Sequence, residues 1–333
     1  MSKRGGCHLL KATFQDVLIA AKRLEGRINK TPLVYSDQLS TETGAEVYIK
    51  MEALQKTGSF KVRGALNKMD ALTQEEQKRG VVTASAGNHA QAVAYASTLK
   101  GISAQIVVPS STPQTKLEGI KRYGGELIIH GDLYDEAEDH ALQLAEETGR
   151  VFVNAFEDDL VVAGQGTAGL EALLEQPDAD ILLIPAGGGG LLCGAALVAK
   201  AINPAIKVIG IQTDTSPPWY YSFKAGKLVD VEYRPSYAEG LHGGITAGNF
   251  DLAKEIVDDF VLVTEKDVAR AMYWMAKQHH YMLEGSAVVG IAALQKGLVP
   301  DVKGKKIITI ATGSNVDLGR LAQFYNEFEE TGK

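Results

Sequence analysis

Short runs of β-branched residues alternate with longer amphipathic stretches along the 333-residue chain. Apolar residues recur at helical spacing within 88–101, 135–149 and 190–202, and the first two of these stretches end in glycine, as helices commonly do. Because parallel strands must be joined by crossover connections, this alternation predicts an α/β protein with mostly parallel sheets and helices on both faces. The predicted strands lie within residues 46–51, 80–85, 104–110, 126–131, 150–155, 181–186, 207–212, 260–265 and 306–312.

The composition is that of a folded globular protein that does not bind polyanions. Hydrophobic residues make up 45% of the chain and charged residues 23%, which excludes the apolar-poor composition of disordered proteins. A length of 333 residues allows two domains, or one large domain with a second inserted in it. The formal net charge of -7 offers no basic field to nucleic acid or anionic lipid, so we expect neither as a partner.

Cysteine usage and the lack of a recognisable targeting segment favour the cytoplasm. Cys7 and Cys193 are the only cysteines, and a chain of this size needs no disulfide, so a reducing compartment is the simpler interpretation. The opening "MSKRGGCHLL" has basic residues but only two adjacent leucines, far short of a signal-peptide core. We find no apolar run long enough for a membrane span.

Three of the predicted strands end in small or polar residues. Residues 81–85 run into "AGNHA", residues 181–186 into "GGGGLL" and residues 306–312 into "GSNVD". In open α/β sheets, ligands bind at the carboxyl ends of strands, near the point where the strand order reverses. We therefore expect these three turns to form one shared site.

Four glycines, Gly187 to Gly190, separate a predicted buried strand from a helix that starts near Leu191. Without β-carbons, several N–H groups can face one anion at a helix N-terminus, where the helix dipole contributes about 0.3–1 kcal/mol. The run therefore predicts a phosphate cradle, although glycines in such a place also let a helix and a strand pack closely. The pattern is neither the G-x-G-x-x-G of dinucleotide folds nor a P-loop, since no G-K-[ST] follows.

Lys61 stands between Phe60 and Val62 in "TGSFKVRGA", residues 57–65. Most of the 34 lysines and arginines must be solvated, and an isolated lysine is usually one of them. In an apolar pocket, however, an ammonium group loses hydration, its pKa falls, and the neutral amine becomes a nucleophile that can form a Schiff base. A phosphate cradle together with such a lysine indicates a phosphorylated aldehyde as the cofactor.

Ser85, Asn88 and His89 lie in "SAGNHAQA", at a predicted turn from strand to helix. Residues of these types in such a turn are more often helix caps than ligands. The side chains of Ser85 and Asn88, with the N–H groups at the helix start, nevertheless suit a carboxylate. An amino acid substrate would present that group.

Five segments occur in the order found in fold-type II pyridoxal-phosphate enzymes: "TGSFKVRGA", "SAGNHAQA", "AGQGTAGLE", "GGGGLL" and "TGSNVDL". Over residues 14–318 they resemble the threonine/serine dehydratase (threonine ammonia-lyase) and serine racemase group. The resemblance implies a homodimer with a tryptophan synthase β-like fold, in which two domains, each with a mostly parallel sheet flanked by helices, hold pyridoxal 5'-phosphate in the cleft between them. It places a large cofactor-binding domain at 1–78 and 158–333 and a small substrate-closing domain at 79–157.

The same resemblance implies roles for individual residues. Lys61 holds the cofactor as a Schiff base and is the catalytic residue, and Phe60 lies against the cofactor ring. A serine hydroxyl of the family faces the pyridine nitrogen, and Thr312 stands at that position here, with Ser314 as the alternative. A neutral hydroxyl does not force the nitrogen to stay protonated, which suits β-elimination. The resemblance implies that Asn88 binds the ring hydroxyl of the cofactor. It implies that the cofactor phosphate binds Gly187, Gly188, Gly189, Gly190 and the N–H of Leu191. The substrate carboxylate is implied to bind the loop of Ser85, Ala86, Asn88 and His89.

The predicted reaction is dehydration and deamination of a 3-hydroxy amino acid, most simply L-threonine or L-serine, to a 2-oxo acid and ammonia. Serine racemase is the alternative. The resemblance implies that racemases of this group use a serine immediately before G-N-H as an acid. This chain has Ala86 there, whose methyl group cannot donate a proton. The metal ligands of these racemases align approximately with Gln212 and Pro218, and proline offers no ligand side chain, so we expect no metal site.

The substrate itself stays open at this stage. The segment "AEGLHGG", residues 238–244, replaces the A-D-G of many relatives in the region implied to face the substrate. A bulkier or acidic substrate, such as a phenylserine, a hydroxyaspartate or a hydroxyectoine-derived amino acid, is therefore a further alternative. A non-catalytic protein that keeps the pocket and a nucleotide-dependent oxidoreductase are disfavoured, because Lys61 is retained and the dinucleotide fingerprint is absent.

Overall fold

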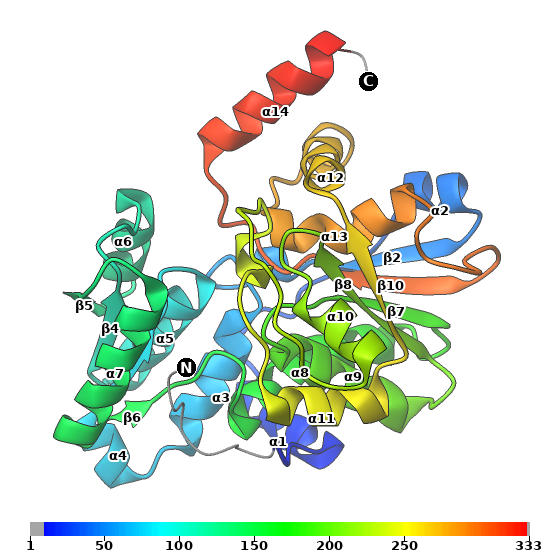
Figure 1. The fold of residues 1–333 in the computed structure, drawn as a ribbon. Helices are drawn as coiled ribbons and strands as arrows, with labels where there is room; N and C mark the ends of the chain where they lie inside the picture. Colours follow the sequence, from blue (N-terminus) through cyan, green and yellow to red (C-terminus); the bar gives the residue numbers. More distant parts are fainter. Residues whose placement is uncertain (1–9, 332–333) are drawn as a thin grey trace.

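Two sheets flanked by helices organise residues 10–331, which the computed structural model describes (Figure 1). Cys7 lies outside the described residues. The larger sheet has the strand order β1-β2-β10-β7-β8-β9, and every neighbouring pair is parallel except β1 and β2. Its strands are β1 (Leu33–Tyr35), β2 (Glu46–Lys50), β7 (Ile181–Pro185), β8 (Lys207–Thr213), β9 (Asp259–Val263) and β10 (Lys306–Ile310).

The smaller sheet forms a second lobe, drawn in cyan and green at the left of Figure 1. Its order is β5-β4-β3-β6, and all three neighbouring pairs are parallel. The strands span residues 81–152, inside the predicted range of 79–157, and the chain returns to the larger sheet with β7. The domain boundaries themselves stay a prediction. The strands are β3 (Val81–Ala84), β4 (Ala104–Val108), β5 (Glu126–Ile129) and β6 (Val151–Phe152).

Helices bury apolar side chains against both faces of each sheet, as the alternating pattern predicted. One face of the larger sheet packs on α2 (Asp37–Thr43), α12 (Glu265–Gln278) and α13 (Gly285–Gln295), and the other on α1 (Phe14–Leu24), α8 (Asp159–Glu175), α9 (Gly190–Ile202) and α11 (Ala247–Ile256). The smaller sheet lies between α7 (Tyr134–Thr148) and a layer of α3 (Lys61–Ala71), α5 (Asn88–Lys100) and α6 (Gln114–Arg122). The remaining helices are α4 (Gln74–Arg79), α10 (Pro218–Ala225), α14 (Leu318–Thr331) and the 3-10 turns η1 (Glu52–Leu54) and η2 (Glu239–Leu241).

The predicted strands are confirmed, and within the described residues one further strand was missed. All nine predicted strands are present, and α5 and α7 end at Gly101 and Gly149 in the left-handed conformation that glycine adopts without steric cost. Strand β1 escaped prediction because it has only three residues, too few to show alternation, and begins directly after Pro32. None of the helices within residues 10–331 is both long and apolar enough to cross a membrane.

Glycines bring three helices unusually close together in the core of the larger lobe. A β-carbon added at Gly164 in α8 would lie 2.6 Å from the α-carbon of Gly64 in α3. On the other side of α8, a β-carbon at Gly194 in α9 would lie 2.4 Å from the carbonyl oxygen of Val162 and 2.7 Å from the backbone nitrogen of Gly166. The segment "AGQGTAGLE" therefore lies within a buried helix, and its glycines let α3 and α9 approach α8 from two sides.

We expect Gly194→Ala to lower the free energy of unfolding by up to about 2 kcal/mol. The added methyl group overpacks a contact between two backbones at a cost of about 1–3 kcal/mol, and the gain of about 1 kcal/mol that alanine brings to a helix interior offsets part of it. Urea-induced unfolding of the cofactor-free protein measures the change. Gly244→Ala is the control, since the nearest atom to its β-carbon is the Tyr233 hydroxyl at 3.9 Å. A Gly194→Ala variant as stable as the control would contradict close helix packing.

Candidate active site

Lys61 is the first residue of α3, and its amine points to the segment that follows β6. The side chain is partly buried, and Nζ donates a hydrogen bond of 3.1 Å to the carbonyl oxygen of Ala155. Burial lowers the pKa of the amine to about 8, and the carboxyl group of Glu284 opposes this fall. The ring of Phe60 lies beside it, with its centroid 5.3 Å from Nζ. A large part of the amine is therefore neutral and nucleophilic at slightly alkaline pH.

A buried ion network fixes α3 two residues after Lys61. The guanidinium group of Arg63 binds Glu52 through Nε and Nη2, both at 2.7 Å, and Glu171 through Nη1 at 2.7 Å. Lys50 donates to the same Glu171 at 2.7 Å. Although burial alone would lower it, the two carboxylates hold the pKa of Arg63 above its usual value. Bidentate pairs of this kind constrain geometry, so they set the direction in which the first turn of α3 points.

The glycine loop turns its carbonyl groups into the protein. Trp219 Nε1 donates to the carbonyl oxygen of Gly187 at 2.5 Å, and Asn249 Nδ2 donates to that of Gly188 at 2.9 Å. Because C=O and N–H of a trans peptide point in opposite directions, the N–H groups of Gly188 and Gly189 face away from these side chains. Helix α9 begins at Gly190, and the N–H groups of its first turn have no partner within the helix. Free N–H groups at a helix start are the donors with which proteins bind anions.

Gly189 is the position where this loop most needs glycine. Its φ of +109° lies in the region that side chains with a β-carbon rarely adopt. A β-carbon there would also lie 2.8 Å from the ring of Trp219 and 3.1 Å from the side chain of Asn249. Trp219 and Asn249, which orient the loop, therefore also leave no room for a side chain at Gly189.

Residues 155 and 156 connect the lysine to the glycine loop. The carbonyl oxygen of Ala155, which accepts from Lys61, would lie 3.7 Å from a β-carbon at Gly190. The α-carbon of Phe156 would lie 3.2 Å from the same point, and its carbonyl oxygen accepts from Asn249. The structure thus brings Lys61 and the glycine loop to one place, although Gly187 lies 126 positions after Lys61 in the sequence.

Thr312 and Ser314 lie next to this place but differ in their hydrogen bonds. The N–H of Phe60 donates to the carbonyl oxygen of Thr312 at 3.1 Å, which joins the end of β10 to the start of α3. The buried Thr312 hydroxyl has no hydrogen-bond partner within residues 10–331. The hydroxyl of Ser314 donates to the carbonyl of Ala53 at 3.1 Å. Buried hydroxyl groups are normally paired, so Thr312 has the capacity for a further partner and Ser314 is already engaged.

Asn88 is the first residue of α5 and contacts the larger lobe. Its Nδ2 donates to the two carboxylate oxygens of Glu284 at 2.8 and 3.0 Å, and its Oδ1 accepts from Asn315 at 2.7 Å. Asn315 follows β10 and Glu284 precedes α13. The turns after β3 and β10 therefore meet directly. The glycine loop after β7 lies beside Ala155, the hydrogen-bond partner of Lys61, and the neighbouring Phe60 is bonded to the turn after β10.

The other residues of the predicted carboxylate loop are Ser85, Ala86 and His89. Ser85 accepts a hydrogen bond from the N–H of Gly87 at 3.3 Å. His89 is buried and its Nε2 lies 3.0 Å from the carbonyl oxygen of Val153. Burial and the nearby Lys61 lower the pKa of His89 to about 3, so the imidazole is neutral. Its backbone N–H, in the first turn of α5, remains available to a carboxylate.

Sequence reasoning missed two residues that the structure places here, Glu284 and Asn315. Glu284 precedes the apolar helix "GSAVVGIAAL", where an acidic residue is usually a helix cap. Asn315 stands in "TGSNVDL", a segment already singled out, so its amide could have been included. The charged residue before a helix that is apolar on all sides is the signal that could have pointed to Glu284.

Gln212, one of the two positions that align with the metal ligands of racemases, already has hydrogen-bond partners. Gln212 donates to the carbonyl of Ala186 at 3.1 Å and accepts from the N–H of Tyr220 at 3.1 Å. Within the described residues, no group of three or more His, Cys, Asp or Glu side chains could hold a metal ion. Independence from metal stays a prediction. Cys193 is buried, and burial raises the pKa of its thiol to about 12.

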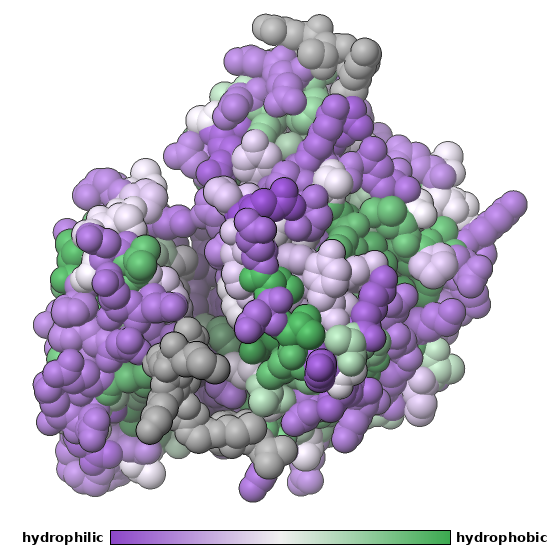
Figure 2. All heavy atoms as spheres, in the orientation of Figure 1, coloured by the Kyte–Doolittle hydropathy of each residue, from purple (hydrophilic) through white to green (hydrophobic). Residues whose placement is uncertain are grey.

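The lobes are also joined outside this site. Figure 2 shows a furrow between the lobe at the left and the rest of the molecule. Lys116 of α6 forms a 2.7 Å ion pair with Glu239 of η2, and Glu239 also pairs with Arg320 of α14 at 2.8 Å. Although burial opposes it, these cations keep the pKa of Glu239 below its usual value. The segment "AEGLHGG" therefore touches the smaller lobe through its glutamate.

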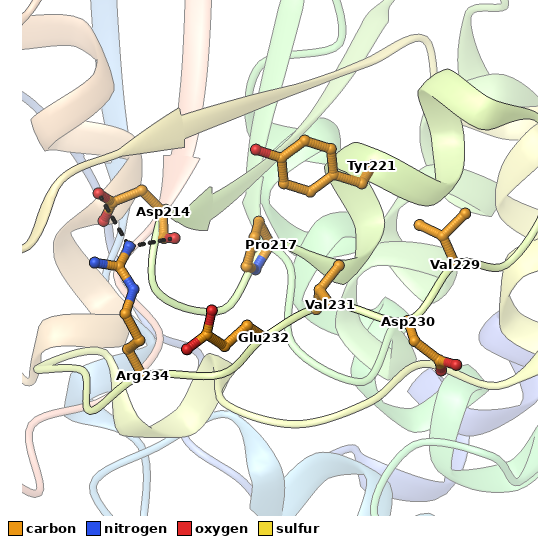
Figure 3. A pocket seen from close by; sticks show the side chains of 8 residues that line it. All are labelled: Asp214, Pro217, Tyr221, Val229, Asp230, Val231, Glu232 and Arg234. Atoms are coloured by element: carbon orange, nitrogen blue, oxygen red, sulfur yellow. Dashed lines mark hydrogen bonds and ion pairs between the residues drawn. The ribbon is translucent and has the colours of Figure 1, made fainter.

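A separate pocket of about 590 Å³ lies beside α10 (Figure 3). An ion pair of 3.7 Å between Arg234 and Asp214 borders it. None of the predicted site residues lines this pocket, so it is not the site of the lysine. The lining residues are Asp214, Pro217, Tyr221, Val229, Asp230, Val231, Glu232 and Arg234.

The residues around Lys61 fit pyridoxal phosphate by three separate features. A neutralised amine suits the aldehyde, the N–H groups at the start of α9 suit the phosphate, and the unpartnered hydroxyl of Thr312 suits a ring nitrogen. The fold is that of a fold-type II enzyme, and the surroundings of the Lys61 amine are those that a Schiff base requires. Residues 24–313 match the pyridoxal-phosphate dependent enzymes, and the chain belongs to this family. It is therefore an enzyme whose cofactor is pyridoxal phosphate.

Relatives within the family include both lyases and racemases. The chain is 43% identical to L-threonine ammonia-lyase of Thermotoga maritima, over 95% of this chain and 78% of the relative, and 36% identical to the catabolic L-threonine dehydratase TdcB of Escherichia coli K12, over 94% and 96%. Among solved structures, maize serine racemase has a TM-score of 0.89 and 34% identity, over 97% of this chain and 99% of that one. The processed threonine deaminase isoform 2 of Solanum lycopersicum has the same score and identity, over 97% of each chain.

We expect the reactivity of Lys61 to rise with pH through about 8, because the neutral amine is the nucleophile and the amine is half deprotonated at its pKa. An ordinary lysine reaches this point only near pH 10.4. Acetylation of the cofactor-free protein at a series of pH values, quantified at Lys61 by peptide mass spectrometry, measures the curve. Nα-acetyl-lysine is the control. A midpoint at Lys61 equal to that of the control would show that the site does not desolvate the amine.

Proposed function

We propose that this enzyme catalyses β-elimination from a 3-hydroxy amino acid, L-threonine or L-serine, and releases a 2-oxo acid and ammonia. The observation that carries the proposal is that the Lys61 amine and the glycine loop border the same carbonyl, that of Ala155. The threonine ammonia-lyase and dehydratase names of the relatives support the same reaction class. The partner that this reaction requires is a small molecule, the amino acid substrate.

The proposed roles follow from what each residue can donate or accept. When bound, pyridoxal phosphate supplies an electron sink for the electron pair left at the α-carbon. Lys61 would hold the cofactor through its amine, and the same amine would accept the α-proton of the substrate as a general base. The N–H groups of Gly187 to Leu191 hold the phosphate, and Phe60 packs beside the ring.

Two further groups orient the ring and the substrate in this proposal. The hydroxyl of Thr312, which has no hydrogen-bond partner among residues 10–331, would bind the pyridine nitrogen, and the Nδ2 of Asn88 would bind the ring hydroxyl. The N–H groups in the loop of Ser85 to His89 take the substrate carboxylate at the start of α5, where the helix dipole favours an anion. The imidazole of His89 is committed to Val153, so we assign this role to backbone groups and to Ser85.

Serine racemase remains the second candidate because two serine racemases are among the structural relatives, from maize and from Dictyostelium discoideum. Racemisation requires an acid on the second face of the planar carbanion to return the proton. Ala86 occupies the position from which the resemblance would supply that acid, and its methyl group cannot donate. We therefore favour elimination. A bulkier or acidic 3-hydroxy amino acid is the third candidate and differs only in the substrate side chain.

Three further features belong to the proposal. We infer that residues 1–78 and 158–333 form the cofactor-binding domain and that residues 79–157 close over the substrate. We also infer a homodimer, by resemblance, and a location in the cytoplasm, because neither cysteine needs a disulfide partner.

We expect Lys61→Ala to lower the rate of 2-oxo acid and ammonia release by at least about 10²–10⁴-fold, since the variant loses both the general base and the covalent link to the cofactor. The assay compares L-threonine, L-serine, phenylserine and hydroxyaspartate in the holoenzyme. Lys56→Ala, at an exposed lysine five residues earlier, is the matched control. Near-visible absorbance that borohydride removes from the wild type should be absent in Lys61→Ala. Ordinary turnover by Lys61→Ala would overturn the mechanism.

We expect conversion of L-serine to D-serine to be at least about a hundredfold slower than release of its 2-oxo acid, because a missing general acid usually costs that much. Chiral chromatography of the amino acid pool, taken during the same time course, gives both rates. D-serine that accumulates as fast as the 2-oxo acid would favour the racemase.

A further inference from the structure

Glu284 stands at the N-cap position of α13 but does not cap the helix. Its backbone is extended, with φ −73° and ψ 160°, as is typical of an N-cap residue, yet its side chain makes no hydrogen bond to the helix. An acidic side chain here would normally accept from the N–H groups of the first turn. The carboxyl group instead reaches across to Asn88 in α5. A structural role as a helix cap therefore does not explain this residue.

The hydrogen bonds of Asn88 are consistent with only one orientation of its amide. Oδ1 accepts from Asn315 at 2.7 Å, and Asn315 itself is held by a donation to the carbonyl of Thr57 at 3.0 Å. Nδ2 donates to both oxygens of Glu284. An amide nitrogen carries two hydrogens, and the carboxylate engages one side of it. The second N–H is left for a group in the site.

The carboxyl group fits closely against the turn that carries Thr312. The N–H of Glu284 donates to the carbonyl of Gly313 at 3.1 Å. A β-carbon at Gly313 would lie 2.6 Å from Oε1 of Glu284, so only glycine leaves room for the carboxyl group. The turn after β10 therefore accommodates Glu284 in a fixed place between Thr312 and Asn88.

The charges around Glu284 come from three elements besides its own. Burial raises the pKa of its carboxyl group to about 7, the hydrogen bond from Asn88 lowers it and Glu239 of η2 raises it. Lys116 of α6 and Lys61 of α3 stabilise the charged form. In return, the carboxylate stabilises the ammonium form of Lys61.

We propose that Glu284 is a positioning residue of the lysine site, which holds the amide of Asn88 in one orientation and acts electrostatically on the amine of Lys61. This inference rests on the proposed function in that Asn88 and Lys61 are its cofactor-binding residues. Glu284 need not touch the substrate. Its carboxyl group is hydrogen-bonded to Asn88 in the turn of the smaller lobe, and its charge favours the ammonium form of Lys61.

The test uses Glu284→Gln, which keeps the size and one acceptor oxygen but removes the charge. In the cofactor-free protein, we expect the pH midpoint of Lys61 acetylation to move down by about one pH unit, because a nearby carboxylate no longer favours the ammonium form. In the reconstituted protein, we expect the affinity for pyridoxal phosphate, measured by titration of the absorbance, to fall about tenfold with the less rigidly held amide.

Two variants separate this role from general damage. Glu75→Gln removes an exposed carboxylate that pairs with Lys78 and should change neither measurement. Asn315→Ala removes the other hydrogen bond to Asn88 but no charge, so it should weaken cofactor binding and leave the Lys61 midpoint in place. A folded Glu284→Gln protein with an unchanged Lys61 midpoint would overturn the proposal. Because acetylation needs no cofactor, a protein that fails to bind pyridoxal phosphate refutes the proposed function without deciding the role of Glu284.

If Glu284→Gln does not fold, Asn88→Ala gives the same test. Loss of the hydrogen bond from Asn88 favours the protonated carboxyl group, since that bond lowers its pKa. The Lys61 midpoint should again move down, and an unchanged midpoint would contradict the proposed electrostatic contact.

Discussion

The close packing of α3 and α9 on the two sides of α8 determines where the chemistry of this protein takes place. Helix α3 begins with Lys61, and α9 begins at the end of the glycine loop, so the distance between amine and loop depends on how near both helices come to α8. Backbone atoms are in contact at Gly64 and Gly164 on one side and at Gly166 and Gly194 on the other. Any larger side chain would separate the helices and with them the two halves of the site. Stability and function therefore depend on the same glycines.

The electrostatic organisation around Lys61 has two parts that behave differently. The network of Arg63, Glu52, Glu171 and Lys50 pairs two basic with two acidic side chains through short hydrogen bonds in a largely buried place. Lys61 has a carbonyl group rather than a carboxylate as its hydrogen-bond partner, so burial lowers its pKa. The paired charges hold the helix still, and the unpaired amine at its first turn is free to react. A direct ion pair at Lys61 would have kept the amine protonated.

The sequence was sufficient to predict the fold, and local signals in it singled out candidate site residues. Strand and helix alternation predicted the parallel sheets, and the residues around Lys61 and Gly187 to Gly190 indicated their chemistry through composition alone. The contact between Glu284 and Asn88 could not be found in this way, because the two residues lie 196 positions apart and the place of Glu284 before a helix suggests a cap. The glycines of "AGQGTAGLE" were recognised only as part of a resemblance, since a contact between two helices leaves no signal within either one. Long-range pairing is what local patterns omit.

The site is divided between the lobes in a way that connects substrate binding to their relative position. The loop of Ser85 to His89 belongs to the smaller lobe, whereas Glu284 and Asn315 belong to the larger lobe, and Asn88 is hydrogen-bonded to both of them. A displacement of the smaller lobe must therefore change the bonds of Asn88 and, through Glu284, the electrostatic environment of Lys61. The ion pair between Lys116 and Glu239 joins the same two lobes at a second point. Because both contacts are polar and the second is exposed to solvent, each breaks at a lower cost than the apolar packing of α3 against α5, which also joins the two lobes.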